Sequence, residues 1–146
     1  MAKVKRILPM IGSYEGDDPY VYACYARRDA EVVAQILAVA KKNNARIAFD
    51  PDYLPGAMTM IAFLSKNSIH DARVWRELDY ARSVFMDVTC YYIDNTYLGK
   101  TKEAEYPFFR FIRLDDVSIL QYGAIINAHF PFDVFPGPPK SVKSEN

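Results

Sequence analysis

The most constraining feature of this chain is an apolar run that leads through a short polar turn into a helical pattern. Residues 60–64, Met-Ile-Ala-Phe-Leu, are typical of a buried strand. Beyond a polar turn that ends at Asp71, apolar residues recur at the spacing of an amphipathic helix: Val74, Leu78 and Ala81. Asp71 can cap this helix, and Glu77 lies between the apolar stripe and the solvent face. Open, helix-covered sheets are built from such strand–turn–helix units.

The same alternation extends over most of the chain. Further strands are predicted over residues 20–25, 46–49, 88–93 and 108–114. Further helices are predicted from Ala30 to about Asn43, capped by Asp29, and from Asp115 or Asp116 to about Ala128. Residues 94–106 are predicted to be a polar loop. This order predicts an α/β fold: a flavodoxin-like, parallel five-stranded sheet with helices on both faces.

Length and composition indicate one ordinary globular domain. The 146 residues are 51% hydrophobic and 25% charged, and the 18 basic and 18 acidic residues cancel, so no global field favours nucleic acid or anionic lipid. No apolar run approaches the roughly 20 residues of a membrane span. We predict a leader over residues 1–18, a domain over 19–130 and a proline-rich, disordered tail over 131–146.

The few metal-binding residue types argue against a metal site. Cys24 and Cys90 both fall in predicted strands, as buried hydrophobes of a reducing cytoplasm would. With only His70 and His129 besides, no zinc-type spacing can be assembled. We therefore expect a cytoplasmic protein without a bound metal.

Three segments together resemble the bacterial type of Toll/interleukin-1 receptor (TIR) domain. Residues 22–31, Tyr-Ala-Cys-Tyr-Ala-Arg-Arg-Asp-Ala-Glu, match the family's opening strand and turn, with Cys24 and Ala26 where serines are usual. Residues 46–56, with Asp50 and the Pro-Gly pair at 55–56, match its second strand and BB loop. Residues 63–81 match its third strand and following helix. The family usually has a helix between the BB loop and the third strand. The interval here is too short for one.

The resemblance implies that Glu77 is the catalytic acid of an NAD⁺ glycohydrolase, since it is followed by Leu78 and by Ala81 as in NAD-cleaving members. NAD⁺ is then the substrate and no cofactor is required. Further contacts to NAD⁺ are hypotheses: stacking by Tyr22, Tyr25 and Tyr53, phosphate binding by Arg27 and Arg28, and contacts from Asp50, Ser65 and Trp75. We expect Glu77 at the carboxyl edge of the sheet, beside a cleft lined by residues 25–28 and 50–56.

Simpler interpretations remain open. Glu77 could be solvated, Trp75 could be a packing residue, and the Asp50 loop could be simple turn chemistry. The chain could instead be a non-catalytic TIR-type module that binds itself or other TIR domains, and a weaker alternative is an enzyme similar to nucleoside deoxyribosyltransferases. In either TIR case we expect the apolar tips Tyr53 and Leu54 to insert between copies in a homo-oligomer.

Overall fold

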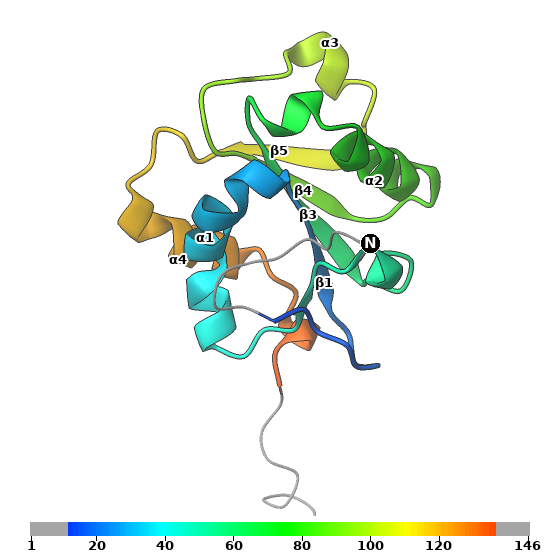
Figure 1. Ribbon diagram of the computed structural model, residues 1–146, viewed down its shortest axis with the longest axis vertical. Helices are drawn as coiled ribbons and strands as arrows, with labels where there is room; N and C mark the ends of the chain where they lie inside the picture. Colours follow the sequence, from blue (N-terminus) through cyan, green and yellow to red (C-terminus); the bar gives the residue numbers. More distant parts are fainter. Residues whose placement is uncertain (1–11, 137–146) are drawn as a thin grey trace, which may run out of the picture.

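The computed structural model describes residues 12–136, which form one five-stranded sheet flanked by helices (Figure 1). All neighbouring strands are parallel, and their order is β2-β1-β3-β4-β5. The strands are β1 (Val21–Cys24), β2 (Ile47–Ala48), β3 (Thr59–Leu64), β4 (Val88–Tyr92) and β5 (Phe109–Arg113). The α-helices are α1 (Ala30–Lys42), α2 (Ala72–Ser83), α3 (Lys100–Glu103) and α4 (Ile119–Ala128). The predicted flavodoxin-like α/β fold is confirmed.

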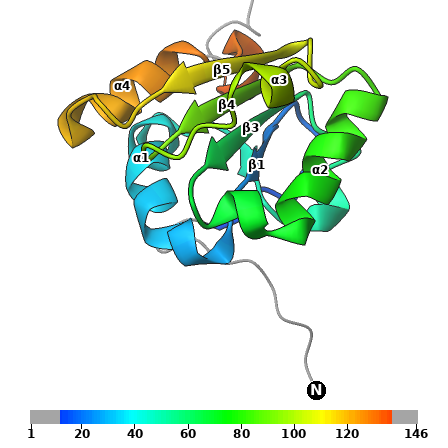
Figure 2. The same cartoon turned by 90° about the horizontal axis from the view of Figure 1, so that it is seen from above.

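Side chains of strand β1 pack on both faces of the sheet. It pairs with β2 on one side and with β3 on the other, and all residues from Tyr20 to Ala26 are buried. Because successive side chains of a strand point to opposite faces, Ala23 packs in the core beneath α1, while Tyr22 and Cys24 pack in the core beneath α2. Figure 2 shows α1 and α4 on one side of the sheet and α2 on the other.

The two long helices next to β1 follow from local sequence. In α1 the buried residues are Val33, Ile36, Leu37 and Ala40, the spacing of a single apolar stripe. In α2 the Asp71 carboxylate accepts hydrogen bonds from the amides of Arg73 (2.9 Å) and Val74 (3.4 Å), which confirms the predicted N-cap. None of the helices within residues 12–136 has the length and apolar character needed to cross a lipid bilayer.

The connection from β2 to β3 contains no α-helix. Residues 49–58, all of them described, hold only the 3₁₀ turn η2 (Pro51–Tyr53), which begins where the Asp50 carboxylate accepts the amide of Asp52. The predicted loss of this helix is confirmed. β2 has only two residues. The connection after it therefore has only a short length of sheet to cover before it reaches the start of β3.

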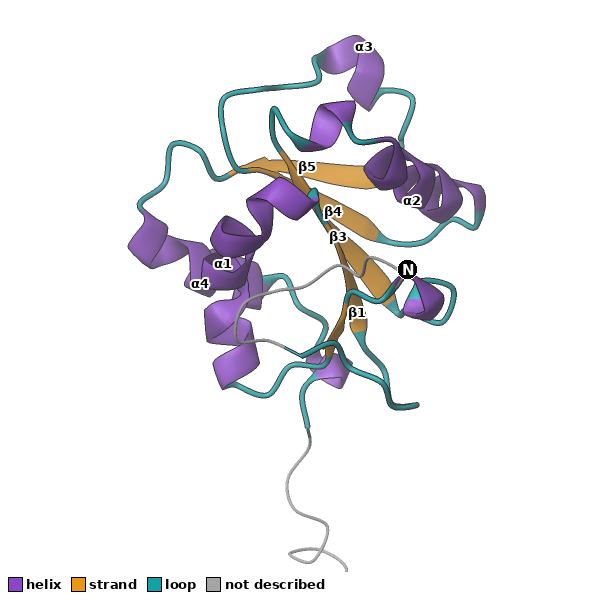
Figure 3. Ribbon diagram, viewed as in Figure 1, coloured by secondary structure: helices purple, strands orange, loops and turns teal. Residues whose placement is uncertain are grey.

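Two predictions around β5 are wrong. The predicted loop 94–106 contains α3, which begins after Gly99 and stands apart from the sheet at the top of Figure 3. The last helix begins at Ile119, so neither Asp115 nor Asp116 occupies its N-cap position. Asp115 instead accepts hydrogen bonds from Tyr97 and Arg113, which compete for the oxygens that a cap would use.

The described part of the predicted leader packs against β2. The amide of Tyr14 donates to the carbonyl of Ile47 at 2.8 Å, in the manner of an added strand pairing. The Ser13 hydroxyl oxygen accepts the amides of Phe49 (2.9 Å) and Asp50 (3.2 Å). Residues 12–18 therefore belong to the domain, and residues 1–11 of the predicted leader lie outside the described residues.

The described part of the predicted tail also packs on the domain, so the boundary at 130 is wrong. Val134 is fully buried in the core beneath α1 and α4, and its carbonyl accepts the amide of Arg46 at 2.9 Å. The Arg46 guanidinium reaches the carbonyls of Pro19 (2.7 Å) and Asp133 (2.6 Å). Residues 137–146 of the predicted tail lie outside the described residues.

Gly123 permits a close approach of α4 to α1. A Cβ at this position would lie 2.2 Å from Cγ2 and 2.6 Å from Cβ of Val39. Helix propensity alone would favour Ala over Gly by about 1 kcal/mol. We expect the opposite sign: Gly123→Ala should lower the free energy of unfolding by about 1–3 kcal/mol, the usual cost of overpacking. Urea unfolding measures this difference, with Ala124→Ser as the control at an exposed neighbouring position. A more stable Gly123→Ala variant would contradict the close packing.

Candidate functional site

The carboxyl ends of β1 and β3 form the point where the chain leaves the sheet in opposite directions. β1 continues through η1 (Arg27–Asp29) into α1, and β3 continues through η3 (Ser68–His70) into α2 on the other face (Figure 2). The two strands are neighbours up to the Cys24–Ala62 pair. In open parallel sheets, ligands bind outside the strand ends at such a switch in direction. This edge is therefore the first candidate for a functional site.

A buried hydrogen-bond network joins the two loops at this edge. The Ser65 hydroxyl donates to Oδ2 of Asp29 at 2.6 Å, and the side-chain amide of Asn67 donates to Oδ1 at 2.7 Å. Both Asp29 and Ser65 are buried. A buried carboxylate is costly unless donors compensate for its lost hydration, and these two side chains supply such donors. The network fixes the turn after β1 against the turn after β3.

Ser65 also organises the turn in which it lies. Its hydroxyl oxygen accepts the amides of Asn67 (3.0 Å) and Ser68 (3.1 Å), and its own amide donates to the Ser68 hydroxyl at 2.7 Å. These partners give the predicted substrate-binding residue Ser65 a clear structural role. The predicted capping role of Asp29 is wrong, because its side chain makes no capping hydrogen bond to α1 and turns instead to Ser65 and Asn67.

Glu77 lies in the interface between α2 and β1. Its Oε2 accepts a hydrogen bond from the Tyr22 hydroxyl at 2.8 Å, Tyr22 is fully buried, and Glu77 is 6% exposed. Glu77 was expected between the apolar stripe and the solvent face but is buried, because residues three apart share a helix face and Val74 faces β1. The Cys24 thiol is 3.9 Å from the Val74 carbonyl. Glu77 is therefore one helical turn back from the carboxyl edge, over Tyr22.

The tyrosines predicted to share the site lie on opposite faces of the sheet. Tyr25 packs in the core beneath α1, with its ring 6.3 Å from that of Phe49, whereas Tyr22 faces α2. Arg27 and Arg28 are exposed at the entrance to α1. The structure thus brings Glu77 together with Tyr22 but not with Tyr25.

The loop from Asp50 to Gly56 lies beside the amino ends of β1 and β3. The Tyr20 hydroxyl donates to the Tyr53 carbonyl at 2.7 Å, and the Tyr53 hydroxyl donates to the carbonyl of Glu15 at 3.0 Å. Leu54 is buried in the core beneath α2. The expectation that Tyr53 and Leu54 project as free tips is wrong, because without a helix in this connection the loop itself covers that end of the core.

Trp75 is a packing residue. Its indole NH donates to the carbonyl of Ile69 at 2.9 Å, and its ring is 6.0 Å from that of Tyr106. The Lys102 ammonium lies 4.9 Å above the indole ring. Trp75 therefore ties the start of α2 to η3 and α3.

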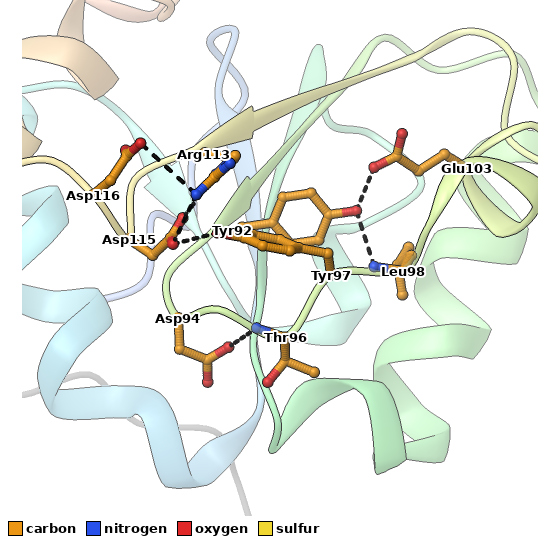
Figure 4. Close-up of polar contacts among 9 residues, drawn as sticks. All are labelled: Tyr92, Asp94, Thr96, Tyr97, Leu98, Glu103, Arg113, Asp115 and Asp116. Carbon is orange, nitrogen blue, oxygen red and sulfur yellow. Dashed lines mark hydrogen bonds and ion pairs between the residues drawn. The ribbon is translucent and has the colours of Figure 1, made fainter.

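A second polar cluster, which was not predicted, lies at the carboxyl ends of β4 and β5 (Figure 4). The Tyr92 hydroxyl donates to the Glu103 carboxylate and accepts the amide of Leu98 at 3.3 Å. Burial, together with the hydrogen bond to Glu103, raises the pKa of Tyr92 above its ordinary value. Tyr92 therefore stays a neutral hydroxyl that pins the loop before α3 to the sheet.

The outer half of this cluster is a set of charges in which Arg113 and Asp116 are exposed and Asp115 is partly buried. The Tyr97 hydroxyl donates to Asp115, and this hydrogen bond is the largest cause that lowers the pKa of Asp115. The Arg113 guanidinium lies 4.5 Å from the centre of the Tyr97 ring and pairs with Asp115 and Asp116. Arg113, Asp115 and Asp116 belong to one short segment, whereas Tyr97 lies 18 residues before Asp115, so local spacing did not reveal that these residues meet.

Metal-binding chemistry has no support within residues 12–136, where no three His, Cys, Asp or Glu side chains are grouped so as to hold an ion. Cys24 and Cys90 are buried free thiols, as predicted, and burial raises the pKa of the Cys90 thiol.

Comparisons of the chain with protein-family models, curated proteins and solved structures found no match.

Ser65 offers a direct test of the buried network. Ser65→Ala removes a donor to Asp29 and an acceptor of two amides, so we expect the free energy of unfolding to fall by about 2–4 kcal/mol, more than for one ordinary hydrogen bond. Ser83→Ala is the matched control. Ser83 is exposed on α2 and its hydroxyl donates to the Tyr80 carbonyl in the preceding turn, so we expect a change within about 0.5 kcal/mol. Equal effects of the two substitutions in urea unfolding would show that the network contributes little.

Proposed function

We propose that this chain cleaves the bond between nicotinamide and ribose in NAD⁺, with Glu77 as the catalytic carboxylate. The observation that carries the proposal is the hydrogen bond from Tyr22 to Glu77 in the buried interface of α2 and β1. A side chain that stabilises charge electrostatically must be held in a fixed position before the reaction. The strand hydroxyl holds the helix carboxylate in this way.

The chemistry requires one negative group near the ribose. When the bond from C1′ to the ring nitrogen breaks, its electron pair returns to the pyridinium nitrogen, and nicotinamide leaves as a neutral ring. Positive charge then develops on the ribose, as in other glycoside cleavages, and a nearby carboxylate stabilises it. Water adds its oxygen to C1′ and releases a proton, which gives ADP-ribose.

The TIR resemblance independently selects the same residue. In sequence it aligns Glu77 with the acid of NAD-cleaving members, and it also covers Asp29 and the Asp50–Gly56 loop. The flavodoxin-like strand order is compatible with this family. Fold alone does not determine function, so the proposed activity depends on the Glu77 site.

Substrate can reach Glu77 only if the covering residues move. Tyr53 and Leu54 pack against the same core as Tyr22, and they belong to a loop that hydrogen bonds tie to Ser13, Glu15 and Tyr20. We propose that this loop opens to admit the nicotinamide ribose. A loop that closes over a bound substrate also keeps bulk water away from the reacting groups.

The second candidate is a non-catalytic interaction module. It is favoured by the 6% exposure of Glu77, because a buried carboxylate paired with a hydroxyl also satisfies a purely structural role. The shortened connection between β2 and β3 favours it as well.

Release of free nicotinamide from NAD⁺ separates these two functions. We expect the parent chain to release nicotinamide and Glu77→Gln to lose on the order of a hundredfold or more in rate, as when other electrostatic stabilisers are removed. The amide keeps the shape of the side chain and can still accept from Tyr22, but it lacks the negative charge.

Glu31→Gln is the matched control, because Glu31 is exposed on α1 and should react like the parent. Thermal unfolding of each variant checks that the fold is retained. A parent chain that releases no nicotinamide would favour the interaction module. An active Glu77→Gln variant would instead place the catalytic group elsewhere.

A further inference from the structure

Helix α2 carries polar residues on both sides of its buried stripe, and the segment around α3 occupies one of these two flanks. Trp75, Asp79 and Arg82 follow one another at the i, i+4 and i+7 spacing of a single helix face. The Tyr106 hydroxyl donates to Asp79 at 2.6 Å, and the Arg82 guanidinium lies 4.6 Å from the centre of the Tyr106 ring. With the contact between Trp75 and Lys102, these interactions satisfy the polar groups of this flank within the fold.

The opposite flank carries Arg73, one helical turn before Glu77. Residues four apart lie on the same side of a helix, with their Cβ atoms roughly 5–6 Å apart, so an Arg and a Glu at this spacing can pair with each other. Glu77 accepts the Tyr22 hydroxyl instead, and no acid of residues 12–136 forms an ion pair with Arg73. Arg73 is half-buried. A half-buried guanidinium without a matching acid is suited to an anionic ligand.

Arg73 lies nearer than Glu77 to the carboxyl edge of the sheet. Helix α2 begins at that edge and runs back along the sheet, antiparallel to β3 (Figure 2). Four helical residues span about 6 Å, so Arg73 lies that much closer to the carboxyl ends of β1 and β3. Ligands of open parallel sheets bind outside these strand ends. A ligand that reaches Glu77 from this edge therefore passes Arg73.

The carboxylates of the neighbouring turns are bound to neutral donors. Asp29, Asp71 and Asp94 lie on the turns after β1, β3 and β4. Asp29 accepts hydrogen bonds from a hydroxyl and a side-chain amide, and the other two accept backbone amides. The charge of Arg73 is therefore not neutralised by any of these three groups, and a ligand has to supply the matching anion.

The substrate of the proposed function carries an anion at the corresponding place. In NAD⁺ the nicotinamide ribose bears on its C5′ oxygen the first phosphate of the pyrophosphate, one sugar ring away from the reacting C1′. The planar guanidinium of Arg matches two phosphate oxygens at once. We propose that Arg73 binds this phosphate, so that the site prefers nicotinamide nucleotides to the nucleoside without phosphate. The position of the ribose in this inference rests on the function proposed above.

Calorimetric binding to the Glu77→Gln variant measures this contact with little cleavage. The probes are nicotinamide mononucleotide, which has the phosphate, and nicotinamide riboside, which lacks it. We expect the mononucleotide to bind about ten- to hundredfold more tightly, as for a hydrogen bond to a charged group. Adding Arg73→Gln should abolish this difference and leave the affinity for the riboside unchanged.

Two further variants separate the guanidinium from charge in general. Arg73→Lys keeps the charge but lacks the planar fork, so part of the preference for the mononucleotide should remain. Lys42→Gln is the matched control, because Lys42 is an exposed cation at the far end of α1, and the full preference should remain.

Nicotinamide release tests the same contact during the reaction. In the parent background Arg73→Gln should lower kcat/KM about ten- to hundredfold for NAD⁺ and for the mononucleotide alike, and should not change it for the riboside. Equal affinities for the two probes, or an equal loss for both on Arg73→Gln, would overturn the inference even if NAD⁺ is cleaved. Binding that depends on both the phosphate and Arg73, without any release of nicotinamide, would support the contact and overturn the proposed cleavage.

Discussion

The alternation of side chains along β1 is the constraint on which the rest of this fold depends. Every residue from Tyr20 to Ala26 is buried, and successive side chains pass to opposite faces, so one strand supplies two cores. This requires helices on both faces and parallel partners on both sides. It also directs Tyr22 toward α2, where its hydroxyl meets Glu77, and turns Tyr25 toward α1.

Features coded by neighbouring residues could be predicted from the sequence. The apolar stripe of α1, the Asp71 cap of α2 and the loss of a helix after β2 depend on spacing within one segment. Features that join distant segments could not. Ser65 and Asp29 are 36 residues apart in the sequence. The hydrogen bond from the Ser65 hydroxyl occupies the Asp29 carboxylate, which therefore does not cap α1 as the neighbouring residues had predicted.

The candidate site shows the same division. The helical position of Glu77 was predicted, but its burial was not: Glu77 was expected between the apolar stripe and the solvent face, although its three-residue spacing from the buried Val74 favours the buried face. Its hydroxyl partner was not predictable, since Tyr22 lies 55 residues earlier. The strand period, however, suffices to separate Tyr22 from Tyr25, because residues three apart on a strand face opposite ways. A shared stacking role for both tyrosines therefore conflicted with the predicted strand itself.

The short strand β2 has a consequence for synthesis of the chain on the ribosome. Arg46, just before β2, bonds to Pro19 on one side and to Asp133 and Val134 on the other, so segments near both ends of the described chain hold this edge of the sheet. A domain that emerges from its amino end can form β1, β3 and α2 early. The contacts of Arg46 with Asp133 and Val134 can form only after residue 134 has left the exit tunnel. The β2 edge of the sheet is therefore completed only after most of the chain has been translated.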